Sequence, residues 1–198
     1  ATKAWAYGTG SKDFVVAVID TGIDYNHEDL KENIFVNTRE IAGNVKDDDS
    51  NGFIDDVSGW NFQAKNNDAM DDNRHGTHVA GTIGARANNN LGTAGVSWNV
   101  SLLPIKFLSA SGSGTLDDAL ESIKYATLMK AHVMSNSWGG GGFSQAMLDA
   151  IVDAKNKAAP SMDQLLNPRR PIITHDQAYA MLDARATQSE SRVLERLP

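Results

Sequence analysis

The sequence predicts an α/β fold, a doubly wound parallel sheet with helices on both of its faces. Three apolar runs, residues 14–20, 101–108 and 132–137, are typical of buried strands. Three further segments are predicted to be helices and alternate with those strands. Residues 75–87 are rich in small residues, apolar residues recur at helical spacing over 115–131, and a helix behind Ser144 is expected to run to about residue 157. This alternation favours parallel strands joined by right-handed crossovers, with helices on both sides of the sheet.

The first predicted strand ends on a carboxylate, Asp20, which follows the apolar residues 15–19. An apolar run without polar alternation indicates a strand buried on both faces. Burying a carboxylate costs free energy unless it is hydrogen-bonded, and ligands gather beyond the carboxyl ends of parallel strands. We therefore expect a functional partner for Asp20 at this edge of the sheet.

The predicted helix at residues 75–87 contains three glycines, Gly76, Gly81 and Gly84. Each costs about 1 kcal/mol relative to alanine in a helix, so it is tolerated where another element packs closely. This helix is therefore expected to be buried.

The two later helices carry capping signals. Thr115 is expected to cap the helix at 115–131, and Ser144 the helix at 144–157. The apolar residues of the last helix are expected to point inward: Met147, Leu148, Ile151 and Val152.

The amino-acid composition excludes several classes of function. The chain has 198 residues, is 41% apolar and 22% charged, and has a formal net charge of −7. This balance predicts a soluble globular core, argues against a nucleic-acid partner and suits cation binding. No apolar run is long enough for a membrane span, and no leader is visible, so an exported protein would be a processed form. With no cysteine, a thiol nucleophile is excluded.

The composition changes near residue 158. All 17 glycines and every lysine precede this point, whereas all but one of the 5 prolines follow it. We expect a domain over 1–158 and an atypical tail over 159–198, with a helix at 175–197 behind a Thr174–Gln177 capping box. An internal deletion, a fused or frame-shifted sequence and a tail that docks on a partner stay open as its origin.

Residues 47–56 form an acidic loop around a single glycine. Its spacing imitates the start of an EF-hand calcium loop, although the final position holds Ser58 where the EF-hand has a glutamate. The alternative is a solvated acidic turn. The predicted calcium ligands are Asp47, Asp49, Asn51, Asp55 and the carbonyl of Phe53.

A second functional group, His75, begins the predicted helix at 75–87. An imidazole held in one tautomer by a carboxylate such as Asp20 is a general base. Other interpretations are a carboxylate that binds ribose or a metal, a histidine that only caps the helix, and a metal pair formed by His75 and His78.

Three segments resemble signature blocks of the subtilisin-like serine proteases. They are Val-Ala-Val-Ile-Asp-Thr-Gly-Ile at 16–23, His-Gly-Thr-His-Val-Ala-Gly-Thr-Ile at 75–83 and Ser-Asn-Ser-Trp-Gly-Gly at 135–140. They occur in the family's order over residues 10–158. The resemblance implies a serine endopeptidase in which Asp20 orients His75 and His75 is the general base, with His78 a packed helix residue.

The resemblance also implies a groove that binds an extended peptide or protein substrate. Such a substrate lies as an added strand held by main-chain hydrogen bonds, which implies broad specificity. One edge of the groove would be Gly112, Ser113 and Gly114, and the other Ser137, Trp138 and Gly139.

A further calcium site is implied around Asp29. The enzyme would then be secreted and stabilised by calcium. The remaining ligands would come from the loop after the helix at 75–87: Ala87, Asn89, Leu91 and Thr93.

After residue 158 the chain departs from the family pattern. The family's nucleophile lies in a Gly-Thr-Ser-Met-Ala block, and an oxyanion-hole asparagine follows another strand; neither block occurs here. Ser161 precedes a methionine but lacks the other residues of the block. We expect a truncated catalytic domain that is inactive alone, unless a complementing chain supplies the serine. A peptide-binding pseudoprotease and a calcium-binding structural domain stay open as alternatives.

Overall fold

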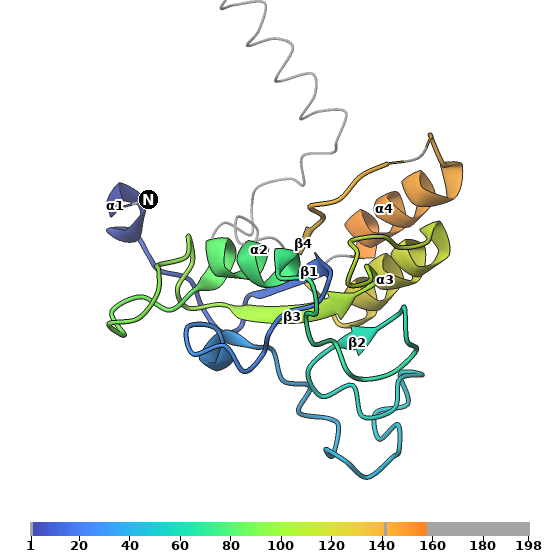
Figure 1. Ribbon diagram of the computed structural model, residues 1–198, viewed down its shortest axis with the longest axis horizontal. Helices are drawn as coiled ribbons and strands as arrows, with labels where there is room; N and C mark the ends of the chain where they lie inside the picture. Colours follow the sequence, from blue (N-terminus) through green and yellow to red (C-terminus); the bar gives the residue numbers. More distant parts are fainter. Residues whose placement is uncertain (1, 141, 158–198) are drawn as a thin grey trace, which may run out of the picture. The chain divides into compact units, whose positions relative to one another are not determined.

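A parallel sheet of four strands forms the centre of the computed structural model, which describes residues 2–140 and 142–157 (Figure 1). Every adjacent pair of strands is parallel, which confirms the predicted α/β class. The strand β2 was not predicted, because two residues are too short to leave a pattern. In the order β2-β3-β1-β4, the strands are β2 (Trp60–Asn61), β3 (Ser101–Lys106), β1 (Val15–Asp20) and β4 (Val133–Ser135).

Helices cover both faces of this sheet, as predicted. In Figure 1, α2 lies along β1 and β3, whereas α3 and α4 lie side by side. None of the helices in the described part combines the length and apolar character needed to cross a membrane. They are α1 (Thr2–Trp5), the 3₁₀ helix η1 (Lys31–Asn33), α2 (His75–Gly84), α3 (Leu116–Leu128) and α4 (Gln145–Lys157).

The two faces of the sheet form separate cores. On one face, Val18 of β1 and Leu102 of β3 pack with Ala80 of α2. On the other face, Ile19 of β1 packs in a core that includes Ile123 of α3. Every residue of β1 is buried, which confirms the strand expected from the apolar run before Asp20.

The helix α2 is buried on one side only, which corrects the expectation that the whole helix is buried. It ends at Gly84, and His78 on its outer side is exposed rather than packed. A Cβ at Gly76 would collide with the carbonyl oxygen of Gly22, and one at Gly84 would lie 2.6 Å from Val100. A Cβ at Gly81 would meet nothing within 4 Å, so this glycine is not explained by packing in the described part of the chain.

The helix α4 corrects a second expectation. Met147 packs against the core, but the other three residues that were expected to point inward are between 44% and 50% exposed. The reason is that α4 turns small residues, Ala150 and the buried Ala154, towards the core, and short side chains allow a close approach. The exposed residues that were expected to point inward are Leu148, Ile151 and Val152.

Both predicted helix caps are confirmed. The hydroxyl of Thr115 accepts a hydrogen bond from the backbone N–H of Asp118 at 3.1 Å, and that of Ser144 accepts one from Met147 at 3.3 Å. The helix predicted at 175–197 and Ser161 lie outside the described residues.

Candidate active site

The structure brings Asp20 and His75 together at the carboxyl end of β1. Nδ1 of His75 lies 2.8 Å from Oδ1 of Asp20, and the backbone N–H of Thr21 donates to the same oxygen at 2.7 Å. The Asp20 carboxylate is fully buried, whereas the His75 side chain is 50% exposed. An ionised carboxylate only accepts hydrogen bonds, so Nδ1 carries the proton and Nε2 is left as a base.

Two glycines let the start of α2 touch the end of β1. Gly22 has a φ of +102°, a conformation that favours glycine, and Gly76 abuts its carbonyl oxygen. The backbone N–H of Gly76 donates to the Thr21 hydroxyl at 2.9 Å. A side chain at Gly76 would push His75 away from Asp20, and one at Gly22 would collide with the carbonyl oxygen of Ala69.

Asp71 holds the loop in front of α2, a role the sequence reasoning missed. Its Oδ1 accepts from the Thr21 hydroxyl at 2.8 Å and from the backbone N–H of Asn73 and Arg74, and its Oδ2 accepts from the backbone N–H and hydroxyl of Thr77. Burial raises the pKa of Asp71, but the hydrogen bonds from Thr77, Asn73 and Arg74 outweigh it and hold the pKa below its ordinary value. The sequence signal that could have identified Asp71 is its position as an acidic residue shortly before a helix.

The chain makes a strained turn just before His75. Arg74 has a φ of 92°, in the left-handed region that side-chain-bearing residues rarely adopt. The side chain of Asn73 donates to the carbonyl oxygen of Ala110 at 2.7 Å, which ties this turn to the loop at 109–114.

Both predicted edges of the substrate groove border one cavity of about 610 Å³. Trp138 forms part of its wall and packs edge to face against Phe107, with ring centroids 4.9 Å apart. Ser137 is next to this lining in sequence but does not contribute to it. Sequence reasoning missed the apolar floor. The lining includes the predicted Gly112, Ser113, Gly114, Trp138 and Gly139 and the additional Phe107, Leu108, Leu116, Ala119 and Phe143.

Asp29 lies against the loop that was predicted to complete its calcium site. Its carboxylate is buried, with Oδ1 2.6 Å from Nδ2 of Asn89 and Oδ2 accepting the backbone N–H of Thr93 at 2.9 Å. A Cβ at Gly92 would collide with Oδ2 of Asp29, so this glycine is required for the approach. Ala87 and Leu91 belong to the same loop, and no described residue donates a hydrogen bond to their carbonyl oxygens.

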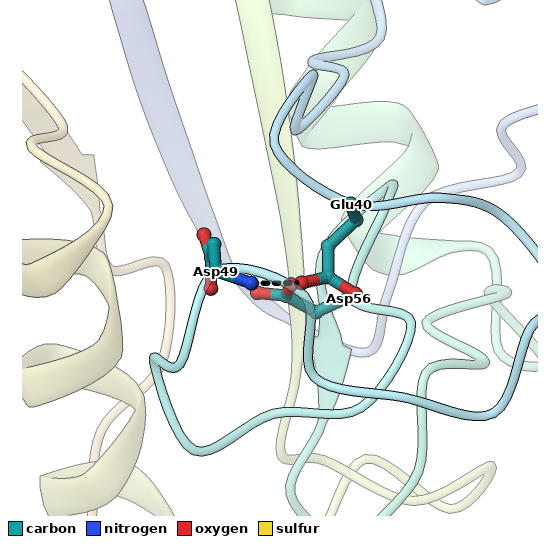
Figure 2. A group of neighbouring side chains, drawn as sticks. All are labelled: Glu40, Asp49 and Asp56. Carbon is teal, nitrogen blue, oxygen red and sulfur yellow. Dashed lines mark hydrogen bonds between the residues drawn. The ribbon is translucent and has the colours of Figure 1, made fainter.

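The acidic loop forms a group that the sequence reasoning found only in part. Carboxylate oxygens of Glu40, Asp49 and Asp56 lie within 4.8 Å of one another (Figure 2). Glu40 accepts the backbone N–H of Asp48 and Asp49, the latter at 3.1 Å and dashed in Figure 2, and that of Asp55. Glu40 and Asp56 were missed, because Glu40 lies before the loop and Asp56 is one position beyond the matched spacing.

Asp56 is fully buried within this group. It accepts hydrogen bonds from the Tyr125 hydroxyl at 2.6 Å and from the side-chain amides of Asn37 and Asn51, both at 3.0 Å. Burial raises the pKa of Asp56 despite these hydrogen bonds, and burial together with the charge of Asp56 raises the pKa of Tyr125. The group is therefore a tightly connected polar network inside the fold.

The remaining predicted ligands of the loop hold its backbone. Asp47 accepts the N–H groups of Asn51 and Gly52 at 3.0 and 2.8 Å, and Asp55 accepts that of Val45 at 2.9 Å. Asp49 shares the N–H of Asn51 with Asp47. The ring of Phe53 packs against Tyr125 and Trp60, with centroids 4.7 and 5.1 Å away.

Comparisons with known proteins agree with this geometry. Residues 11–166 match the model of the Subtilase family. Subtilisin-like protease 1 of Plasmodium vivax is 45% identical over 199 aligned positions, which cover 89% of this chain and 32% of that protein. The cell wall-associated protease of Bacillus subtilis is 38% identical over 65% of this chain and 12% of the relative. The major intracellular serine protease of the same bacterium is 38% identical over 78% of this chain and 43% of the relative.

The fold has a carboxylate–histidine pair at the strand ends, and the family model matches most of the chain. The chain belongs to the subtilase family, the subtilisin-like serine proteases. It spans less than half of the length of each of these relatives.

Proposed function

We propose that this chain carries the acid–base half of a serine endopeptidase site. The observation that carries the proposal is the 2.8 Å hydrogen bond between Asp20 and Nδ1 of His75. Nε2 of His75 would take the proton of an attacking serine hydroxyl and return it to the leaving amine, while Asp20 stabilises the imidazolium. The half-exposed position of the imidazole leaves room for that serine.

These 198 residues contain no block that matches the family nucleophile, so we propose that the chain alone does not hydrolyse peptides. In subtilisin, removing the nucleophilic serine lowers turnover by about 2 × 10⁶. The test incubates the purified chain with a fluorogenic peptide and with a serine-directed phosphonate. Hydrolysis equal to that of the His75→Ala variant and no labelling are expected; labelling at Ser161 would contradict the proposal.

The groove between the two glycine-containing edges is the proposed binding site for an extended peptide. Its volume of about 610 Å³ and its apolar floor, which includes Phe107 and Leu116, suit an apolar side chain of such a peptide. This same observation favours a second candidate, a pseudoprotease that binds without cleaving. Isothermal titration with an uncleaved peptide tests the groove, which both candidates need. The two are separated by adding a segment with the family serine block, because only an endopeptidase then gains peptide hydrolysis.

A complementing chain is the proposed source of the serine. A second cavity, of about 880 Å³, runs along the outer side of α2 next to Arg74 and Thr77, and Gly81 and Ala85 line it with small side chains. A segment seated there would lie beside the helix turn that presents His75. Mixing this chain with a separately made segment that contains the family serine block tests the idea, because phosphonate labelling of that serine then requires both pieces.

Calcium is the proposed stabilising ion. Asp29, and the group of Glu40, Asp49 and Asp56, offer carboxylate oxygens, which calcium prefers. To add its own oxygen, Asn89 would have to turn its side-chain amide, whose nitrogen faces Asp29. Bound calcium would neutralise carboxylates that otherwise repel one another. A fall in melting temperature on adding a chelator is expected, and restoration by calcium but not by magnesium would assign the ion.

We infer a secreted location from these calcium sites, because weak calcium sites are filled at extracellular concentrations. By name, the relatives include both a cell wall-associated and an intracellular protease, so membership of the family does not determine the cellular location. Fractionation of cells that express the complete gene product, followed by immunoblotting, tests the inference.

A further inference from the structure

Lys106 is a buried charged residue that the proposed chemistry does not use. It is the last residue of β3, pairs in register with Asp20, and is 2% exposed. Paired positions on neighbouring strands place their side chains on the same face, which here is the face that α2 covers. The Lys106 side chain therefore lies at the strand ends from which the Asp20 carboxylate projects.

The ammonium group of Lys106 has a complete set of partners. Nζ donates to the carbonyl oxygen of Thr21 at 2.7 Å, to Oδ1 of Asp72 at 2.7 Å and to the carbonyl oxygen of Leu108 at 2.8 Å. An ammonium has three N–H donors, so each is used. A buried charge requires such a set, since an unpaired charge in an apolar environment is costly.

The three partners belong to the three segments that build the site. Thr21 directly follows Asp20, and Asp72 lies three positions before His75. Leu108 directly precedes the loop that contributes one edge of the groove. One ammonium thus joins the strand end, the turn before α2 and the base of the groove.

We propose that Lys106 is a positioning residue for the Asp20–His75 pair, an inference that rests on the proposed function of that pair. Its ammonium fixes the turn after Asp20 and the turn before His75 at the separation that their 2.8 Å hydrogen bond needs. Without the ammonium, two buried carbonyl groups lose their donor and the two turns relax independently.

The test observes the Nδ1 proton of His75 by NMR in the full 198-residue chain. A proton shared with a buried carboxylate resonates at low field and exchanges slowly with water, and a role limited to overall stability does not alter that exchange in a chain that stays folded. Asp72→Asn removes the charge of one partner, at a side chain that is 50% exposed, and leaves an amide oxygen that accepts a weaker hydrogen bond. The matched control is Asp153→Asn on α4, where a carboxylate that is 52% exposed pairs with Lys157.

We expect exchange of the His75 proton to be about tenfold faster in the Asp72→Asn variant, the difference between a charge-assisted and a neutral hydrogen bond, and unchanged in Asp153→Asn. In Lys106→Met the low-field resonance disappears. Wild-type exchange in Asp72→Asn overturns the proposal, and this variant decides alone if Lys106→Met does not fold. If the wild-type chain shows no slowly exchanging Nδ1 proton, the proposed Asp20–His75 pair is contradicted. If every variant keeps the slowly exchanging proton, only the positioning role of Lys106 is contradicted.

Discussion

The turn in front of α2 depends on a single carboxylate, and its removal should be measurable. Asp71→Ala removes the acceptor of the Thr77 N–H in the first turn of α2, a loss comparable to that of a helix cap at about 1 kcal/mol. It also leaves the Thr21 hydroxyl, in a residue that is 1% exposed, without its acceptor, which costs a further 1 to 2 kcal/mol or so. The expected total is a loss of about 2 to 3 kcal/mol in the free energy of unfolding.

Urea unfolding followed by circular dichroism measures this loss directly. For a chain of this size, about 2 kcal/mol lowers the melting temperature by about 4–8 °C. The control is Asp117→Ala in the first turn of α3, where Thr115 and not Asp117 provides the cap. If Asp71→Ala loses less than about 0.5 kcal/mol, as an ordinary surface substitution does, the hydrogen bonds of Asp71 do not hold the helix.

The same variant has a pH signature. Because the folded pKa of Asp71 is lowered from 3.8, its contribution is complete above the unfolded pKa and is lost as the pH falls towards the folded pKa. The stability difference between wild type and Asp71→Ala should therefore shrink below about pH 4. A difference that stays constant to about pH 2 would show that the charge of Asp71 is irrelevant.

Four further substitutions test other parts of the fold, each by urea unfolding. Gly76→Ala should destabilise the chain and release the His75 Nδ1 proton, whereas Gly81→Ala, in open space, should stabilise it by about 1 kcal/mol. Tyr125→Phe should cost about 1 to 3 kcal/mol because buried Asp56 loses a donor; a neutral effect would contradict the network. Ile151→Ser should stay within about 0.5 kcal/mol, and a larger loss would mean that α4 faces the core differently.

The parts of the fold that follow from local pattern could be predicted. The strand before Asp20 is an uninterrupted apolar run, and burial of all its residues follows from that run alone. The close approach of α2 to β1 is likewise visible as Gly76 in a helix. The side of α4 that faces the core was harder to predict. Ile151 belongs to a row of large apolar residues on this helix, but the row that packs against the core contains the small residue Ala154.

The parts of the site that depend on long-range contacts could not be predicted. Glu40 reaches the acidic loop only because the chain folds back, with its carboxylate binding N–H groups as far as Asp55. In the sequence, Lys106 is only a residue near the end of an apolar strand. Its hydrogen-bond partners Thr21 and Asp72 lie 85 and 34 positions away, so no local pattern connects them. Short motifs name Asp20 and His75. Of the groups that hold them, Asp71 is indicated by its place shortly before a helix, whereas the sequence pattern does not indicate Lys106.

The central position of β1 implies that the two members of the pair differ in local stability. β1 lies between β3 and β4, so its amide hydrogens are released from exchange protection mainly by global unfolding. His75 occupies the first turn of a helix with one solvent-facing side, and its opening is limited by the local hydrogen bonds of Asp71 and Thr21 and not by global unfolding. On heating, Asp20 should therefore stay in place while His75 moves away from it. The hydrogen bond between the two should break reversibly at a lower temperature than the cooperative unfolding of the sheet.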